Sequence, residues 1–533
     1  MLKTMNSRYL NSRSATWTNI RVEDPAAVSG MCPLCIEECP FICEIALSAF
    51  RGRDALYPAP FLFGLSTAGA VKDYGLDWSH FNFHCEVRGA EGIEPDPEKV
   101  LFPNVDVETT VGGIRLKIPV ITGALGSTAI AAKYWRSVAI GAALSGIIAT
   151  VGENVCGMDP EAVFSDGKVV KSPALESRVK AYREFWDGLY GAIVVQTNVE
   201  DQMFGVDTYA LTKLEVDVIE RKWGQGAKAI GGEVRVSDLD RAIMLKRRGY
   251  LVIPDPENPE VQAAFKSGFI KSFERHSRVG ITSREEFLED VDKLREQGAK
   301  RISLKTGAYR PTATAYTLKL ASEAKIDYMT FDGCEGGTGM SPVPMMDEMG
   351  VPTVYLEAQV LKCAQILRSK GRHMPDIVMA GGFISETQVL KAIAMSNFGD
   401  GPYVKAVVIG RAAITAAMKA EYFVKLSREG SLPKGFSSTY GSEPDKFFPF
   451  LPELKAKLGD KIGTVPWGTL GLYGYMERIK VGLQQLLAGM RKFKLSLASR
   501  SDLFALSDRA AKATGIPLVE ESESEAIESI LLD

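Results

Sequence analysis

Residues 376–412, DIVMAGGFISETQVLKAIAMSNFGDGPYVKAVVIGRA, contain one pattern twice. In each copy, a short apolar run rich in β-branched residues ends at glycine and is followed by a helical pattern, first in 376–382 and then in 406–412. Runs this apolar are typical of parallel strands that helices cover on both faces. The stretch therefore predicts two successive strand–loop–helix units.

Six further apolar runs precede this stretch and end in the same way. They are 119–124, 147–152, 191–197, 216–223, 301–307 and 328–333. Eight such units in succession predict an α/β fold of the (β/α)8 or TIM-barrel type. The interval 224–300, between the fourth and fifth runs, is long enough to form a functional lid at the carboxyl end of a barrel strand.

The chain divides into three parts by pattern. Residues 1–105 contain clustered cysteines and show no strand–helix alternation, so we expect an N-terminal cysteine-rich cap. Residues 106–425 carry the barrel. Residues 426–533 begin as irregular chain and continue as amphipathic helices with an acidic end, so we expect a C-terminal helical extension.

Composition excludes several classes of protein. The 533 residues have a net charge of −3 and a pI near 6.0, so no basic surface indicates nucleic-acid binding. The most apolar uncharged run, 137–152, is shorter than the roughly 20 residues that a membrane-spanning helix needs. No secretory signal is evident at the N-terminus, so we expect a cytoplasmic protein whose eight cysteines serve metal or redox chemistry rather than disulfides.

The glycines after the seventh and eighth runs indicate a phosphate site. In a barrel of this type, phosphate commonly rests on the loops that follow strands seven and eight. Gly381 and Gly382 would let backbone N–H groups approach a phosphate at a helix N-terminus, and Gly410 with Arg411 would complete the site. The alternative is that these glycines only close tight turns.

Two lysines end buried strands. Lys222 and Lys305 lie at the ends of the fourth and fifth runs, where a buried cation needs an anionic or polarisable partner. A flavin is such a partner, because a cation near its ring stabilises the anionic reduced form. The alternative is an ion pair with a carboxylate of the barrel. Together with the predicted phosphate site, the lysines indicate FMN.

Four motifs then become recognisable as a set. ERKWGQGAKAIGGEV (220–234), ISLKTGA (302–308), FDGCEGGTGMSP (331–342) and the stretch quoted first resemble the FMN-binding synthase domain of the glutamate synthase family. The similarity covers about 119–419. It implies a (β/α)8 barrel that binds FMN.

The resemblance assigns roles to individual residues. The phosphate contacts would be Gly381, Gly382, Gly410 and Arg411. The residues at the flavin ring would be Gly123, Ala124, Gln196 and Lys305. The substrate and flavin pocket would include Gln225, Lys228 and Glu335, and we expect Lys222, Lys305, Cys334 and Glu335 to be the catalytic group. For Cys334, simple packing is the alternative.

Departures from the family pattern are also informative. The chain starts Met-Leu-Lys without a glutaminase domain, so it would not release ammonia from glutamine by itself. Cys334 and Glu335 stand where the family usually has His-Asp, which puts the usual substrate in question. The segment after the last barrel strand lacks the cysteines that hold a three-iron cluster in the family.

An N-terminal cysteine cluster could replace that iron site. Cys32, Cys35, Cys39 and Cys43 are close enough in sequence for four thiolates to hold a [4Fe–4S] cluster, with zinc or unligated core thiols as alternatives. An electron entrance next to FMN favours iron–sulfur. We interpret Cys85, Cys156 and Cys363 as buried or packing cysteines.

These features predict an FMN-dependent oxidoreductase of the glutamate synthase type. Electrons from the cluster would reduce an imine formed from a 2-oxoacid and ammonia or an alkylamine. The alternatives are a dehydrogenase working in the oxidative direction and an electron-transfer subunit of a larger complex. Because no G-x-G-x-x-G follows a strand, we expect ferredoxin or a flavoprotein as donor, with an amidotransferase or reductase subunit as a possible partner in an oligomer.

Overall fold

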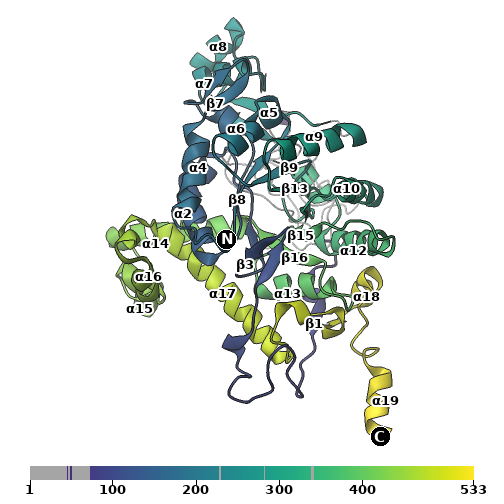
Figure 1. The fold of residues 1–533 in the computed structure, drawn as a ribbon. Helices are drawn as coiled ribbons and strands as arrows, with labels where there is room; N and C mark the ends of the chain where they lie inside the picture. Colours follow the sequence, from purple (N-terminus) through teal and green to yellow (C-terminus); the bar gives the residue numbers. More distant parts are fainter. Residues whose placement is uncertain are drawn as a thin grey trace, which may run out of the picture.

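The computed structural model describes residues 45, 49–50, 73–226, 228, 230–280, 283–337 and 341–532. Within these ranges the chain forms a barrel of parallel strands surrounded by helices, with further helices packed below it (Figure 1). In the same part of the chain, no helix combines the length and the apolar character that crossing a membrane requires.

Eight parallel strands form the barrel, in the order β4-β16-β15-β14-β13-β9-β8-β5. They are β4 (Val120–Thr122), β5 (Ala149–Val151), β8 (Ile193–Thr197), β9 (Val218–Lys222), β13 (Arg301–Thr306), β14 (Tyr328–Asp332), β15 (Asp376–Ala380) and β16 (Val404–Ile409). Isolated bridges close the ring between β4 and β5, where Thr122 N–H donates to the Ile148 carbonyl at 3.0 Å. Seven of the eight predicted runs contain one of these strands, and the eighth, 406–412, overlaps β16, which begins two residues earlier, so the (β/α)8 prediction is confirmed.

The interior of the barrel changes from apolar to charged along the strands. Inward-facing residues alternate with outward-facing ones, so along β9 they are Val218, Glu220 and Lys222. Val218 belongs to a small apolar cluster at the amino end, which the hairpin of β2 (Thr109–Val111) and β3 (Ile114–Leu116) closes. Charged side chains therefore collect at the carboxyl end of the strands.

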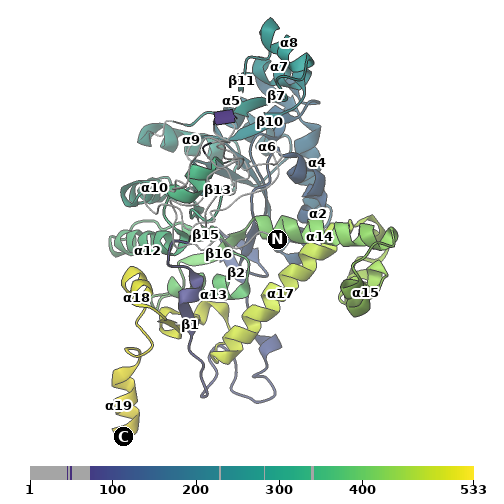
Figure 2. The same cartoon turned by 180° about the vertical axis from the view of Figure 1, so that it is seen from behind.

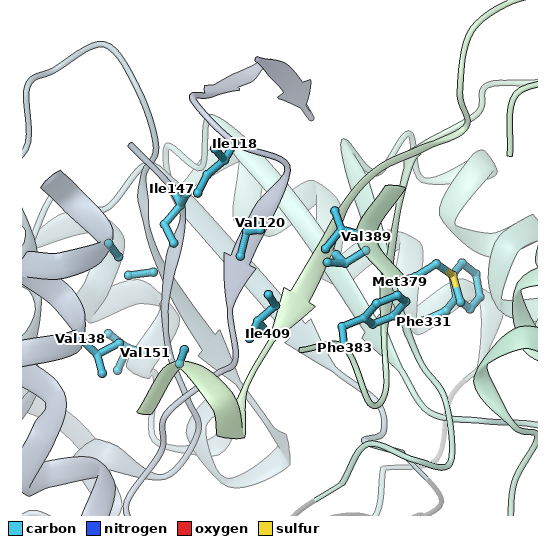
Figure 3. Packing of buried hydrophobic residues seen from close by; sticks show 14 of the residues in the cluster. Ile118, Val120, Val138, Ile147, Val151, Phe331, Met379, Phe383, Val389 and Ile409 are labelled. Carbon is cyan, nitrogen blue, oxygen red and sulfur yellow. The ribbon is translucent and has the colours of Figure 1, made fainter. Parts of the chain in front are cut away.

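The larger core lies between the strands and the surrounding helices. The helices are α2 (Ala129–Ser145), α4 (Pro173–Arg183), α6 (Val206–Thr212), α9 (Arg284–Glu296), α10 (Pro311–Glu323), α12 (Thr353–Ser369), α13 (Glu386–Met395) and α14 (Arg411–Arg428). Figure 3 shows part of this core, with Val120, Ile409 and Met379 on three strands and Val138 and Val389 on two helices. This packing fixes where each strand ends and thus where its loop begins.

The long interval after β9 is mostly regular structure rather than an open loop. It contains a three-stranded antiparallel sheet in the order β10-β12-β11. Its elements are β10 (Glu233–Val236), α7 (Leu239–Arg247), β11 (Leu251–Ile253), α8 (Pro259–Lys266) and β12 (Phe273–His276). The unit lies beyond the carboxyl end of the barrel, at the top of Figure 1, so it covers the face where the strand loops emerge.

The C-terminal segment packs on the barrel. Helix α17 (Trp467–Gly489) contacts α2, α13 and α14 and follows the short helices α15 (Lys434–Tyr440) and α16 (Leu451–Leu458). Strand β17 (Leu503–Ala505) pairs with β1 (Phe81–Phe83), which joins the two ends of the described chain. The last helix, α19 (Ser524–Leu532), points away from the body in both views (Figures 1 and 2).

Candidate active site

A cavity of about 1110 Å³ opens at the carboxyl ends of the barrel strands. Loops after β4, β5, β9, β14, β15 and β16 line it, and the β10–β12 sheet contributes to its wall. This is the position in which barrel enzymes carry their active sites. The cavity has two chemically distinct ends, which we call the glycine end and the charged end.

The glycine end comprises Gly123, Gly381, Gly382, Gly410 and Arg411, all of which line the cavity. Gly381 and Gly382 have φ angles of +113° and +80°, a backbone region that residues with a Cβ rarely adopt. A Cβ at Gly381 would also collide with the hydroxyl of Thr353. The loop after β15 can therefore lie flat against a ligand only because both residues are glycine.

The loops after β4 and β16 touch each other at the glycine end. A Cβ on Gly123 would lie 2.6 Å from the Cα of Gly410, so the loop after β4 leaves no space for a side chain at Gly123. Gly410 is also the N-cap of α14, and no side chain caps that helix. The first N–H groups of α14 thus face the cavity with the positive end of the helix dipole, an arrangement suited to phosphate.

The charged end comprises Glu153, Lys222, Lys305 and Asp332. Lys222 and Lys305 are register partners on the adjacent strands β9 and β13, so their side chains emerge side by side. Lys222 forms an ion pair with Glu153, and Lys305 Nζ lies 3.6 Å from Asp332 Oδ2. Both lysines therefore have the carboxylate partners that the sequence left open, while all four side chains line the cavity.

The pKa values of the two carboxyl groups at the charged end shift in opposite directions. Burial raises the pKa of Asp332, although Lys305 opposes the shift. Burial also acts to raise the pKa of Glu153, but Lys222 beside it brings that pKa below its ordinary value. Glu153 is thus held as a carboxylate, in an ion pair with Lys222.

Gln196 lies one layer below the cavity rather than on its wall. Its Nε2 donates to Glu220 Oε1 at 2.6 Å, and Ser303 Oγ donates to Glu220 Oε2 at 2.9 Å. Burial raises the pKa of Glu220, with Lys305 as the main opposing influence. This buried polar layer supports Lys305 from beneath. Ala124, in contrast, lines the cavity beside Gly123.

Gln225 and Lys228 both line the cavity, on the loop after β9. Gln225 accepts from Lys222 Nζ at 2.7 Å and donates to the Gly337 carbonyl at 2.9 Å, so it ties two strand loops together. Lys228 Nζ lies 3.4 Å from Glu233 Oε2 in a buried pair. Burial lowers the pKa of Lys228 to about 8, which Glu233 opposes.

Glu335 and Cys334 are neighbours with different surroundings. Glu335 lines the cavity and accepts from Thr353 N at 2.8 Å and Thr353 Oγ1 at 2.6 Å; burial raises its pKa. Cys334 is fully buried, is absent from the cavity wall, and has a pKa raised to about 12 by burial. A thiol with such a pKa stays protonated at neutral pH.

Sequence reasoning missed several residues of the site. Glu153 directly follows the predicted run 147–152, and Asp332 lies near the end of the run 328–333, so their position at strand ends was a usable signal. Arg275 gave no such signal, because it belongs to β12 in the inserted sheet. It lines the cavity, is 1% exposed, and its Nε has no hydrogen-bond partner in the described structure.

The predicted metal ligands cannot be placed. Cys32, Cys35, Cys39 and Cys43 lie outside the described residues. Among the residues that are described, no group of three or more His, Cys, Asp or Glu side chains could hold a metal ion. Of the other cysteines, Cys156 is buried as expected, Cys363 is partly buried, and Cys85 is exposed, contrary to the expectation of burial.

Comparison with known proteins agrees with this arrangement. The sequence model for the conserved region in glutamate synthase matches residues 67–249 and 269–417, which is more than half of the chain. The chain belongs to the glutamate synthase family. The matched ranges include every barrel strand and both ends of the cavity.

Relatives within the family are partial matches. The archaeal glutamate synthase [NADPH] of Archaeoglobus fulgidus is 27% identical over 61% of this chain and 51% of its own length. The archaeal-type glutamate synthase [NADPH] of Thermotoga neapolitana is 42% identical over 17% of each chain. The matched part of this chain thus spans about half the length of the Archaeoglobus fulgidus protein and a much smaller share of the Thermotoga neapolitana protein. Among solved structures, a flavocytochrome b2 mutant with pyruvate bound aligns over 85% of this chain and 84% of its own, at 13% identity and a TM-score of 0.48.

Proposed function

We propose that this protein is an FMN-dependent oxidoreductase of the glutamate synthase type. The observation that carries the proposal is the pairing of two ends in one cavity: a glycine-lined helix N-terminus suited to phosphate, and two lysines on adjacent strands, of which Lys305 is buried and Lys222 is partly buried. Flavin mononucleotide has a phosphate group and an electron-accepting ring, and each end of the cavity suits one of these two parts. Membership of the family supports the same cofactor.

The residues present fit FMN. The glycine end offers backbone N–H groups, Arg411, and no Cβ that would obstruct a phosphate. Lys305, supported by Asp332 and by the Glu220 layer, would place a positive charge beside the ring. Gly123 and Ala124 would leave room for the ring along the loop after β4. Gln196 would act indirectly, by holding Glu220 beneath Lys305.

Bound FMN supplies storage of two electrons and hydride transfer to an electrophilic carbon or nitrogen. The protein itself holds the substrate. Lys222, fixed by Glu153 and Gln225, would bind and polarise a carbonyl or carboxylate oxygen. Arg275 is a second buried cation on the wall, available for an anionic group of the substrate. Lys228, with a pKa near 8, is able to exchange a proton near neutral pH, and burial raises the pKa of Glu335 above its ordinary value.

The substrate that suits this arrangement is an imine formed from a 2-oxoacid and ammonia or an alkylamine. The cations bind the carboxylate of the 2-oxoacid, and the carboxylates nearby suit a cationic iminium. Electrons would arrive singly from a [4Fe–4S] cluster on Cys32, Cys35, Cys39 and Cys43, supplied by ferredoxin or a flavoprotein. The amine would come from solution or from a partner amidotransferase.

The proposal is tested by the visible absorption spectrum of protein purified without oxygen, before and after dithionite, with iron and acid-labile sulfide measured on the same sample. We expect flavin bands above a broad shoulder that bleaches on reduction. The same protein is then assayed for turnover of 2-oxoacids with ammonia or methylamine, which we expect to observe. Protein that neither contains flavin nor binds added FMN would contradict the proposal, and flavin reduction without any turnover would indicate an electron-transfer subunit.

The cluster is tested separately with Cys39→Ala. We expect this variant to lose iron, sulfide and the broad shoulder while retaining FMN, because the glycine and charged ends are untouched. Cys85→Ala is the matched control, since Cys85 is an exposed thiol. Unchanged iron content in Cys39→Ala would refute the assignment, and bound zinc in place of iron would favour a structural site.

A further inference from the structure

The C-terminal helix α17 contributes to the cavity. Tyr475, on α17, is one of the residues that line it, although the barrel strands end well before this helix in sequence. The same helix packs against α14, whose N-terminus forms part of the glycine end. Figures 1 and 2 show α17 running beside α14 and reaching α13 below the barrel. An element outside the barrel thus reaches its ligand-binding face.

Tyr475 contacts the loop that carries Gly381 and Gly382. Its hydroxyl donates to the carbonyl of Ile384 at 2.7 Å. Burial raises the pKa of Tyr475 to about 12, so the phenol retains the proton it donates. From the other side, Gln388 Oε1 accepts from Ile384 N–H at 2.8 Å. The N–H and the carbonyl of Ile384 are therefore both hydrogen-bonded to side chains.

A second contact lies farther along α17. Arg478 forms an ion pair with Glu386, at 3.0 Å, where α13 begins. Gly482 faces the same carboxylate side chain, and a Cβ there would collide with Glu386. Tyr475, Arg478 and Gly482 are spaced i, i+3 and i+7, so they share one face of the helix. Glycine at this position therefore allows α17 to approach Glu386 closely.

Resting on the proposed function, we propose that α17 is a clamp for the phosphate of the cofactor, with Tyr475 as its positioning residue. By fixing Ile384, Tyr475 holds the strained Gly381–Gly382 backbone in the conformation that turns its N–H groups inward. The clamp touches only the glycine end. It therefore affects ligands that carry a phosphate and leaves contacts to the flavin ring unchanged.

The test compares FMN with riboflavin, which has the same ring but no phosphate. Dissociation constants are measured by flavin fluorescence on full-length protein freed of cofactor, for wild type, Tyr475→Phe and Gly482→Ala. For Tyr475→Phe we expect FMN to bind about fivefold to tenfold more weakly, as loss of one hydrogen bond allows, and riboflavin to change less than about twofold. Gly482→Ala should show the same selectivity.

Tyr473→Phe is the matched control, because Tyr473 lies on the same helix but is absent from the cavity wall. It should leave both constants unchanged. If Tyr475→Phe weakens FMN and riboflavin equally, or neither, the clamp is refuted while the proposed function stands. If wild-type protein binds neither flavin, the proposed function fails and the clamp fails with it.

Discussion

The glycine end of the cavity consists almost wholly of backbone, whereas the charged end consists of side chains that neutralise one another. At the glycine end, Gly123 lies so close to Gly410 that a Cβ on Gly123 does not fit. At the charged end, Lys222 and Lys305 each face a carboxylate from another strand loop. One end tolerates almost no change in shape, and the other almost no change in charge. Substitutions should therefore fail for different reasons at the two ends.

The largest effect is expected at the glycine end, from Gly123→Ala. The added Cβ would meet Gly410 at 2.6 Å and separate the loops after β4 and β16. Overpacking of this kind costs about 1–3 kcal/mol, so we expect flavin binding to weaken by roughly tenfold to a hundredfold. Flavin content after purification and the dissociation constant for FMN measure this effect.

Gly435→Ala is the control for the added methyl group, because a Cβ at Gly435 has no atom within 4 Å. It should bind FMN like the wild type. Normal flavin content in Gly123→Ala would mean that the loops can separate without cost, which would remove the contrast between the two ends.

A smaller effect is expected from Lys305→Met, which changes the charge of the site rather than its shape. Met keeps most of the length of the side chain but removes the cation that would stabilise the reduced flavin. We expect FMN to remain bound and its two-electron potential to become more negative by roughly 30–60 mV, equivalent to about 1.4–2.8 kcal/mol. A spectroelectrochemical titration gives this value.

Lys300→Met is the matched control, since the Lys300 side chain is 69% exposed and pairs with Asp217 at the opposite end of the barrel. Its potential should equal that of the wild type. A Lys305→Met protein with an unaltered potential would show that the lysine serves only Asp332 and has no part in tuning the cofactor.

The third effect concerns the stability of the folded protein rather than the cofactor, at Asp201 next to the charged end. Burial raises the pKa of Asp201 to about 7, while N–H groups of Asn154 and Asn198 oppose the shift. The folded state thus holds an extra proton from about pH 4 to pH 7, so stability falls as the pH rises through this window, by at most about 1.4 kcal/mol per pH unit. In Asp201→Asn this fall should be absent.

Thermal unfolding of wild type and Asp201→Asn across that pH range makes the measurement. The stability of the variant relative to the wild type should increase as the pH rises, and the difference between the two should be constant above pH 7. Asp292→Asn, at a side chain that is 73% exposed, should give a curve parallel to that of the wild type. Parallel curves for Asp201→Asn as well would mean that Asp201 ionises normally in the folded protein.

The glycine end was predictable because its determinants are local. A strand followed by Gly-Gly or Gly-Arg and then by a helix specifies a loop whose backbone is free to approach a ligand, so Gly381, Gly382, Gly410 and Arg411 could be predicted to meet at one site. Lys222 and Lys305 could be located at strand ends for the same reason. Their partners could not be assigned, because Glu153 and Asp332 come from loops far apart in sequence.

Local sequence patterns were sufficient to predict the eight strands, their parallel arrangement and the end of the barrel at which the cavity opens. They were sufficient because strand periodicity and glycine placement act over a few residues. Only the tertiary structure decided that Cys334 lies off the cavity wall, that Gln196 supports the site from below, and that Arg275 and Tyr475 line it. The places of Arg275 and Tyr475 depend on how an inserted sheet and a C-terminal helix pack against the barrel, and no pattern in either segment encodes its position relative to the strands.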